Sequence, residues 1–124
     1  MKRVVFTPEL IGHAFHDATA LRALLSWRDG HLRPVVSRDL ALTYTKTLRS
    51  IGLGSVLLKR WLWWFSAAEK SEYHPEIVTK LDNPASLCDR LAIEMDVMGV
   101  VHSDAFSPTS DFAAQWLSAS RVLD

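Results

Sequence analysis

Three short apolar runs constrain the fold of this chain most strongly, because stretches with helical spacing separate them. The runs are Arg3 to Phe6, Arg33 to Val36 and Gly99 to Val101. β-Branched and aromatic residues of this kind are typical of buried strands. Strands that alternate with helices favour a parallel sheet covered on both faces. We therefore predict an α/β protein, a three-layer α/β/α sandwich with a central parallel sheet.

The intervening stretches carry signals for helix starts and stops. Pro8 suits a first helical turn, Ser37 is a plausible N-cap, and Pro84 can open a later helix. Ile77 and Val78 could form one more short strand. Apolar residues at helical spacing predict helices that begin near the following positions: Asp17, Arg38, Gly54, Pro84 and Thr109.

Length and composition place the chain among ordinary globular domains. Its 124 residues predict a single domain over 1–124, and 48% hydrophobic with 23% charged residues argues against disorder. The formal net charge of zero neither supports nor excludes a nucleic-acid partner. Cys88 is the only cysteine, so it can form no intrachain disulfide and no cysteine-based zinc site. With no apolar stretch long enough to cross a membrane, we expect a cytoplasmic protein.

Several phrases, in order along nearly the whole chain, resemble the PIN-domain family, in particular the toxin-like PIN proteins of bacterial toxin–antitoxin systems. The last phrase resembles the family's T-P-x-x-F, although the strand that usually precedes it is missing from the pattern. The phrases are RVVFTPE at 3–9, SWRDG at 26–30, VVSRDLALTY at 35–44, the segment 86–104 and SPTSDF at 107–112. The resemblance implies a PIN-like α/β/α fold.

The resemblance also implies a site of three or four carboxylates that hold Mg²⁺ or Mn²⁺ for RNA cleavage. In this chain Thr7, Thr43 and Ser86 stand at three of the acidic positions, and only Asp104 matches an acid. Hydroxyl groups carry no formal charge and are poor ligands for magnesium. The implied protein is a degenerate PIN domain that has lost nuclease activity and needs no cofactor.

The alternative is an active metal-dependent endoribonuclease with a rearranged site. Asp104 and Glu9 would then be its catalytic acids, with Mg²⁺ or Mn²⁺ as cofactor. Glu9 lies two residues beyond Thr7 and could supply a substitute carboxylate. The competing interpretations are a strand-end aspartate that caps a turn and an exposed glutamate in a first helical turn. Asp89 could share a helix face with Ser86 or be solvated.

Other chemistries have weaker support. His13 and His16 could lie on one helical face, but no third ligand at diagnostic spacing accompanies them, which argues against a zinc site. His102 is expected to be structural. The chain lacks the Gly-x-Ser-x-Gly phrase of serine hydrolases and a glycine-rich phosphate loop.

A cluster of aromatic residues is the most unusual feature of the sequence. One helical face can bury Trp61 and Phe65 but not also Trp63, and hardly Trp64. Exposed aromatic residues often mark protein interfaces, so we predict an interface formed by Trp61, Trp63, Trp64 and Phe65. The alternative is that a neighbouring helix covers Trp63 and Trp64. The predicted partner is a second copy of the chain, an antitoxin-like protein or, with less support, RNA.

Overall fold

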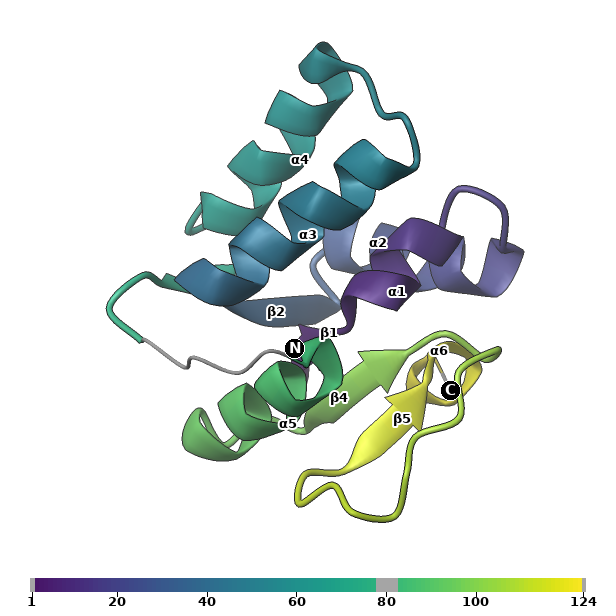
Figure 1. The fold of residues 1–124 in the computed structure, drawn as a ribbon, viewed down its shortest axis with the longest axis vertical. Helices are drawn as coiled ribbons and strands as arrows, with labels where there is room; N and C mark the ends of the chain where they lie inside the picture. Colours follow the sequence, from purple (N-terminus) through teal and green to yellow (C-terminus); the bar gives the residue numbers. More distant parts are fainter. Residues whose placement is uncertain (1, 78–82, 124) are drawn as a thin grey trace.

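The computed structural model describes residues 2–77 and 83–123 and shows an α/β protein with a five-stranded, all-parallel sheet flanked by helices (Figure 1). The predicted α/β/α architecture is confirmed. The elements are β1 (Lys2–Phe6), α1 (Pro8–His13), α2 (Ala18–Arg28), β2 (Leu32–Ser37), α3 (Arg38–Ser50), α4 (Ser55–Ser66), β3 (Glu72–His74), α5 (Pro84–Glu94), β4 (Gly99–His102), β5 (Trp116–Ser118) and α6 (Ala119–Val122).

The first strand lies at the centre of the sheet, whose order is β3-β2-β1-β4-β5. Val4 is paired with Pro34 of β2 on one side and with Gly99 of β4 on the other. The three strands predicted from apolar runs are these central ones, and their apolar side chains are buried. Because all strands are parallel, their carboxyl ends meet at one edge of the sheet, and polar residues from β1 and β4 come together there.

Helix caps follow the sequence signals closely. The Asp17 carboxylate accepts a hydrogen bond from the Thr19 N–H at 2.9 Å, and the Ser37 hydroxyl accepts one from the Leu40 N–H at 3.2 Å. Such side-chain oxygens satisfy backbone donors that have no partner inside the helix. At the other end of α2, Gly30 has a φ of +86°, a left-handed conformation that favours glycine.

Gly99 allows β4 and the segment before β5 to approach each other. A Cβ atom at this position would lie 2.6 Å from the Gln115 carbonyl oxygen, closer than any real contact. The same carbonyl accepts a hydrogen bond from the Val100 N–H at 2.8 Å. Only glycine therefore fits where β5 joins the sheet.

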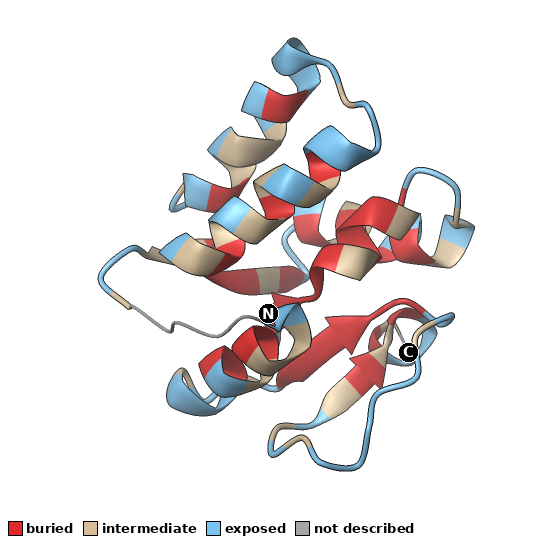
Figure 2. Cartoon of the chain, in the orientation of Figure 1, coloured by how far each residue is buried: buried red, intermediate tan, exposed pale blue. Residues whose placement is uncertain are grey.

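The buried residues lie along the sheet and on the helices that cover it (Figure 2), and they include aromatic residues of α2, α3 and α4. Trp27 is fully buried and stacks on Phe65 with ring centroids 5.3 Å apart and an interplanar angle of 7°. The Tyr44 hydroxyl donates a hydrogen bond to the Phe6 carbonyl oxygen at 2.5 Å, and burial raises the pKa of Tyr44 well above its ordinary value. This bond ties α3 to the end of the central strand.

The C-terminal quarter differs from the prediction. Within the described residues 83–123, no helix begins near Thr109, and the phrase at 107–112 does not open one. The chain instead forms β5 at Trp116–Ser118 and the short α6 after it. Asp89 accepts hydrogen bonds from the N–H groups of Ala113 and Ala114, which withdraws these donors from any helical turn.

The predicted strand at Ile77 and Val78 is also displaced. The strand β3 lies earlier, at Glu72–His74, where Val36 pairs with Tyr73. Ile77 is outside a strand, and Val78 lies outside the described residues. The three residues of β3 are half-buried and mostly polar, so they form no apolar run that sequence analysis could find.

In the part of the chain that the structure describes, no helix combines the length and apolar character needed to span a bilayer.

Candidate functional site at the strand ends

Thr7 and Glu9 begin the site where β1 passes into α1. The Thr7 hydroxyl oxygen caps the helix by accepting a hydrogen bond from the Leu10 N–H at 3.2 Å. The same hydroxyl donates a hydrogen bond to Glu9 Oε1, with 2.8 Å between the oxygens. Thr7 is therefore buried, and its hydroxyl is occupied both as a donor and as an acceptor.

The Glu9 carboxylate bridges the ends of β1 and β4. Its Oε1 accepts a hydrogen bond from the Ser103 N–H at 2.8 Å, and its Oε2 accepts one from the Ser103 hydroxyl at 2.6 Å. His13 Nδ1 lies 3.5 Å from Oε2 on the solvent side. Three donors from Thr7 and Ser103 therefore satisfy most of the acceptor capacity of the carboxylate. Ser103, which is fully buried, is the hydrogen-bond partner of Glu9 that the sequence analysis did not identify.

Asp104 points away from this bridge. Its Oδ1 accepts a hydrogen bond from the Ser120 N–H at 3.1 Å, in the first turn of α6. The residue is exposed and joins the end of β4 to the end of β5. This contact joins Asp104 to α6 and not to the turn that directly follows it, which is closed by the Phe106 N–H and the Ser103 carbonyl oxygen.

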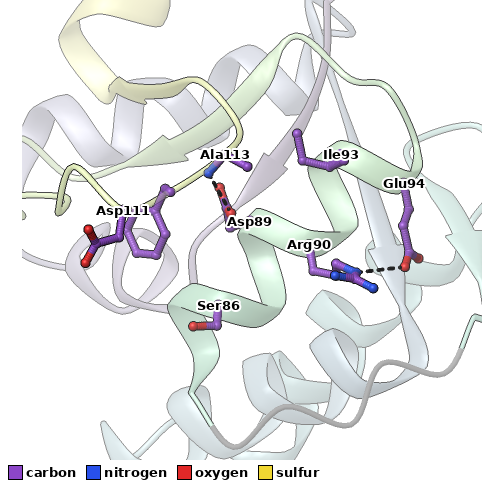
Figure 3. Close-up of a pocket in the computed structure, with 8 residues that line it drawn as sticks. Ser86, Asp89, Arg90, Ile93, Glu94, Asp111 and Ala113 are labelled. Atoms are coloured by element: carbon purple, nitrogen blue, oxygen red, sulfur yellow. Dashed lines mark hydrogen bonds and ion pairs between the residues drawn. The ribbon is translucent and has the colours of Figure 1, made fainter.

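Thr43 lies on α3 and Ser86 on α5, and their side chains have different surroundings. The Thr43 hydroxyl donates a hydrogen bond to the Asp39 carbonyl oxygen of its own helix at 3.0 Å. Ser86 lines a hollow of about 560 Å³ between α5 and the segment before β5, with Asp89 and Asp111 (Figure 3). We call this space the α5 hollow. Thr7 lines a different hollow. No hydrogen bond among the described residues joins any two of Thr7, Thr43, Ser86 and Asp104, and the convergence of these residues in one cleft stays a prediction.

Asp89 holds the segment before β5 in place. Besides the Ala113 and Ala114 N–H groups, the indole N–H of Trp116 donates a hydrogen bond to Asp89 Oδ1 at 3.0 Å. The aspartate is half-buried, not solvated as one interpretation of the sequence had it. All these contacts are structural, and they orient the Trp116 ring.

The second space, which we call the strand-end hollow, lies at the carboxyl ends of β1 and β4 and measures about 370 Å³. Its main lining residues are Thr7, Glu9, Thr47, Asn83, Phe106 and Trp116. The chain leaves β1 toward β2 on one side and leaves β4 toward β5 on the other, so the strand order reverses between β1 and β4. Open α/β sheets ordinarily bind ligands at such a point. Chain topology therefore makes the strand-end hollow the candidate binding site.

A metal-dependent reaction would need a different set of ligands from the one at this edge. In the described ranges, no group of three or more His, Cys, Asp or Glu side chains is placed to hold an ion. Glu9 is the nearest carboxylate, and its oxygens already accept three hydrogen bonds. The residues present do not fit Mg²⁺ or Mn²⁺, which prefer several charged oxygen ligands.

The remaining titratable candidates are structural. The rings of His13 and His16 lie 5.1 Å apart with no third ligand assembled around them among the described residues. His102 is buried, and its Nδ1 lies 2.7 Å from the Ser103 carbonyl oxygen. Cys88 is buried beneath the Phe6 carbonyl, and desolvation raises the pKa of its thiol, which disfavours the reactive thiolate.

The aromatic cluster on α4 is divided between core and surface. Phe65 is buried, so it cannot be part of an interface. Trp61 and Trp64 are half-buried and pack on Trp27, with ring centroids 5.8 and 5.4 Å from it. Trp63 is 55% exposed and remains free to contact a partner.

Comparisons of this chain with protein-family models, with curated proteins and with solved structures find no match.

Proposed function

We propose that this protein is a degenerate PIN-like domain related to toxin–antitoxin ribonucleases, that it lacks nuclease activity, and that it acts by binding protein. The parallel α/β/α architecture supports the PIN-like assignment. Thr7, Thr43 and Ser86, at positions where the family carries acids, support the loss of nuclease activity. We also propose a cytoplasmic location, in keeping with a single, unpaired cysteine.

One observation carries the proposal: the carboxylates near the strand ends serve as structural acceptors. Glu9 accepts from Thr7 and Ser103, and Asp104 accepts from Ser120. A carboxylate that gives up these bonds to bind a metal would leave backbone or hydroxyl donors without partners, at about 1–3 kcal/mol each. Metal binding and the fold therefore compete for the same oxygens.

An RNA-cleavage assay tests the non-catalytic half of the proposal. Purified protein, incubated with single-stranded RNA and Mg²⁺ or Mn²⁺, should cleave no faster than the same sample with EDTA. The Glu9→Gln and Asp104→Asn variants should behave as the wild type does. EDTA-sensitive cleavage that either substitution abolishes would contradict the proposal and favour the alternative of an active, rearranged ribonuclease.

The exposed side of α4 supports binding to a second copy of the chain. Val56, Leu57 and Trp63 are 73%, 48% and 55% exposed, an unusual apolar density for one short helix. Covering such area stabilises an interface by about 25 cal/mol per Å², before association costs are subtracted. We therefore propose a homodimer in which α4 forms part of the interface, centred on Trp63 and bordered by Trp61 and Trp64.

Sedimentation velocity tests the dimer with one substitution. Wild type should sediment as a dimer, and Trp63→Ala should shift it toward monomer while leaving the circular dichroism spectrum unchanged. Trp64 is unsuitable for this purpose, because it packs on Trp27 and its removal would disturb the core. Ile93→Ala, an exposed apolar residue of α5, is the matched control. A monomeric wild type, or a dimer that Trp63→Ala leaves intact, contradicts the proposal.

A groove between α2 and α4 favours a second candidate, an antitoxin-like protein partner. The groove measures about 280 Å³ and has Arg28 and Arg60 among apolar side chains: Leu21, Leu24, Leu25, Trp61 and Trp64. Apolar side chains bordered by two arginines suit an apolar segment that carries acidic residues. Co-purification with the product of an adjacent gene, lost in Arg60→Glu, would support this candidate. A complex that resists the charge reversal would argue against it.

A further inference from the structure

Both polar and aromatic side chains line the strand-end hollow. Phe106 and Trp116 supply the aromatic wall, with ring centroids 5.8 Å apart and an interplanar angle of 24°. Both residues are half-buried, so each keeps part of its surface open. The polar residues that line the hollow include Thr7, Glu9 and Asn83. Because the hollow lies apart from α4, ligand binding in it does not depend on the proposed dimer.

Contacts behind the aromatic wall fix its position. Phe112 stacks on Trp116 with ring centroids 4.2 Å apart, and His102 contacts both Trp116 and Phe106. The Trp116 indole N–H donates a hydrogen bond to Asp89 Oδ1, with Nε1 and Oδ1 3.0 Å apart. With its donor occupied, Trp116 has only the surface of its ring to offer a ligand. A ring held in this way stacks on a planar partner at small entropic cost.

The described residues that line the hollow disfavour a phosphate group. Of the described residues that line it, Glu9 alone is ionisable, and it is an acid. A phosphate would meet that carboxylate with no arginine or lysine among these lining residues to balance the charge. A simple cation is also a poor match, because Thr7 and Ser103 already satisfy Glu9 and the two rings lie nearly parallel instead of enclosing a cation.

Neutral hydrogen-bonding groups complete the site. Asn83 Oδ1 accepts a bond from the Ala85 N–H at 2.9 Å, which directs its amide N–H₂ to other partners as a donor. The Thr47 hydroxyl donates to the Thr43 carbonyl oxygen at 3.1 Å, and its oxygen can still accept. A donor and an acceptor beside an aromatic surface match the edge and face of a nitrogen heterocycle.

We propose that the strand-end hollow binds an uncharged nucleobase or nucleoside, whose ring stacks on Phe106 and Trp116 while its edge faces Asn83 and Thr47. The volume of about 370 Å³ lies in the range of small-molecule sites. The resemblance would place an RNA phosphodiester at this edge of the sheet, whereas the proposed ligand is an uncharged base or nucleoside. Binding is noncovalent and requires no metal.

An NMR titration with adenosine, guanosine, cytidine and uridine, each compared with its 5′-monophosphate, tests the proposal. At least one nucleoside should bind saturably and shift the amide signals of Asn83, Ala85 and residues 103–106. Its monophosphate should bind more weakly. Phe106→Ala should weaken binding about tenfold, as expected for one lost stacking contact. Phe15→Ala, an exposed aromatic outside the hollow, should leave it unchanged.

A second variant guards against loss of folding in the aromatic wall. Ala85 lines the hollow in the first turn of α5, so Ala85→Leu should block binding while the rings stay intact. The proposal is overturned if no nucleoside binds saturably, or if binding survives both Phe106→Ala and Ala85→Leu. It is equally overturned if the monophosphates bind more tightly than the nucleosides, or if only RNA chains bind.

Discussion

Glu9 and Ser103, residues 94 positions apart in the chain, are joined by two hydrogen bonds at 2.8 and 2.6 Å. One comes from the backbone of Ser103 and one from its hydroxyl, so the carboxylate grips the end of β4 at two points. Hydrogen bonds to a charged group contribute about 1.5–3 kcal/mol when they are well formed. The bridge therefore helps to hold the two central strands together at the edge where a ligand would bind.

Ser103→Ala should lower the free energy of unfolding by about 1–2 kcal/mol, because Glu9 loses its hydroxyl donor. Glu9→Ala should cost more, since the buried Ser103 N–H is then left without its acceptor. Urea denaturation followed by circular dichroism measures both changes. Glu94→Gln, in an exposed pair with Arg90, is the control and should change stability by less than about 0.5 kcal/mol. Equal stability of Ser103→Ala and wild type would show that the bridge contributes nothing.

Gly99→Ala should destabilise the protein by about 1–3 kcal/mol, because its Cβ would collide with the Gln115 carbonyl oxygen. Relief requires a backbone shift, since the obstructing atom is not a flexible side chain. Thermal unfolding gives the change in stability. In Gly54→Ala no atom of the described residues lies within 4 Å of the new methyl group, so only the helix cap is affected, by under about 1 kcal/mol. The prediction fails if the two alanine variants unfold at the same temperature.

The Arg3–Glu72 pair predicts how stability depends on pH. The hydrogen bond from Arg3, with Nε and Oε2 2.5 Å apart, lowers the pKa of Glu72 below its ordinary value of 4.5, and Arg33 and His74 add to the effect. Because the pKa of Glu72 is lower in the folded state than in the unfolded state, its ionised carboxylate stabilises the fold at pH values above the pKa of the unfolded state. This contribution is lost as the pH falls through the lowered value.

Glu72→Gln should therefore be less stable than wild type at pH 7, by about 0.5–1 kcal/mol for a partly exposed pair. The difference should shrink as the pH drops through and below the ordinary pKa of 4.5. Urea denaturation at several pH values provides the test. Glu69→Gln, an exposed residue, is the control and should track the wild type. A gap between Glu72→Gln and wild type that stays constant down to acidic pH would refute the assignment.

Asp89→Ala should loosen the segment before β5, because Ala113, Ala114 and Trp116 all lose their acceptor. Hydrogen exchange at the Ala113 and Ala114 amides should speed up by at least about tenfold, the equivalent of roughly 1.4 kcal/mol. Asp111→Asn changes an exposed carboxylate of the same α5 hollow and should leave these rates unaltered. Unchanged exchange in Asp89→Ala would mean that stacking alone orders the segment.

Local signals made the central strands and most helix starts predictable. Val4, Val5 and Phe6 are buried as their apolar run indicated, and Asp17 and Ser37 cap the helices that come after them. The two edge strands were not predicted because pairing with a distant strand creates them. Trp116 becomes a strand residue only because Val100 lies beside it. Over three residues, an apolar helix stripe and a strand look the same in sequence.

The position of Thr7 and Glu9 directly after the first strand could be predicted from the sequence, but their contacts could not. Glu9 is the acid that meets the neighbouring strand. Successive side chains of an extended chain point to opposite sides, so Ser103 faces Glu9 whereas Asp104 turns to Ser120. A sequence motif that matches Asp104 cannot reveal this one-residue difference.

The central place of β1 also has a consequence for synthesis on the ribosome. Val4 leaves the ribosome before Pro34 and Gly99, its partners on the two sides, so it must wait for Gly99 before its second side can be covered. At about 5–20 residues per second, that wait lasts roughly 5–20 s. During that interval the nascent chain presents an unpaired edge of valines, the kind of surface that recruits other chains. We therefore expect that a chaperone bound during this interval would shield the exposed edge of β1.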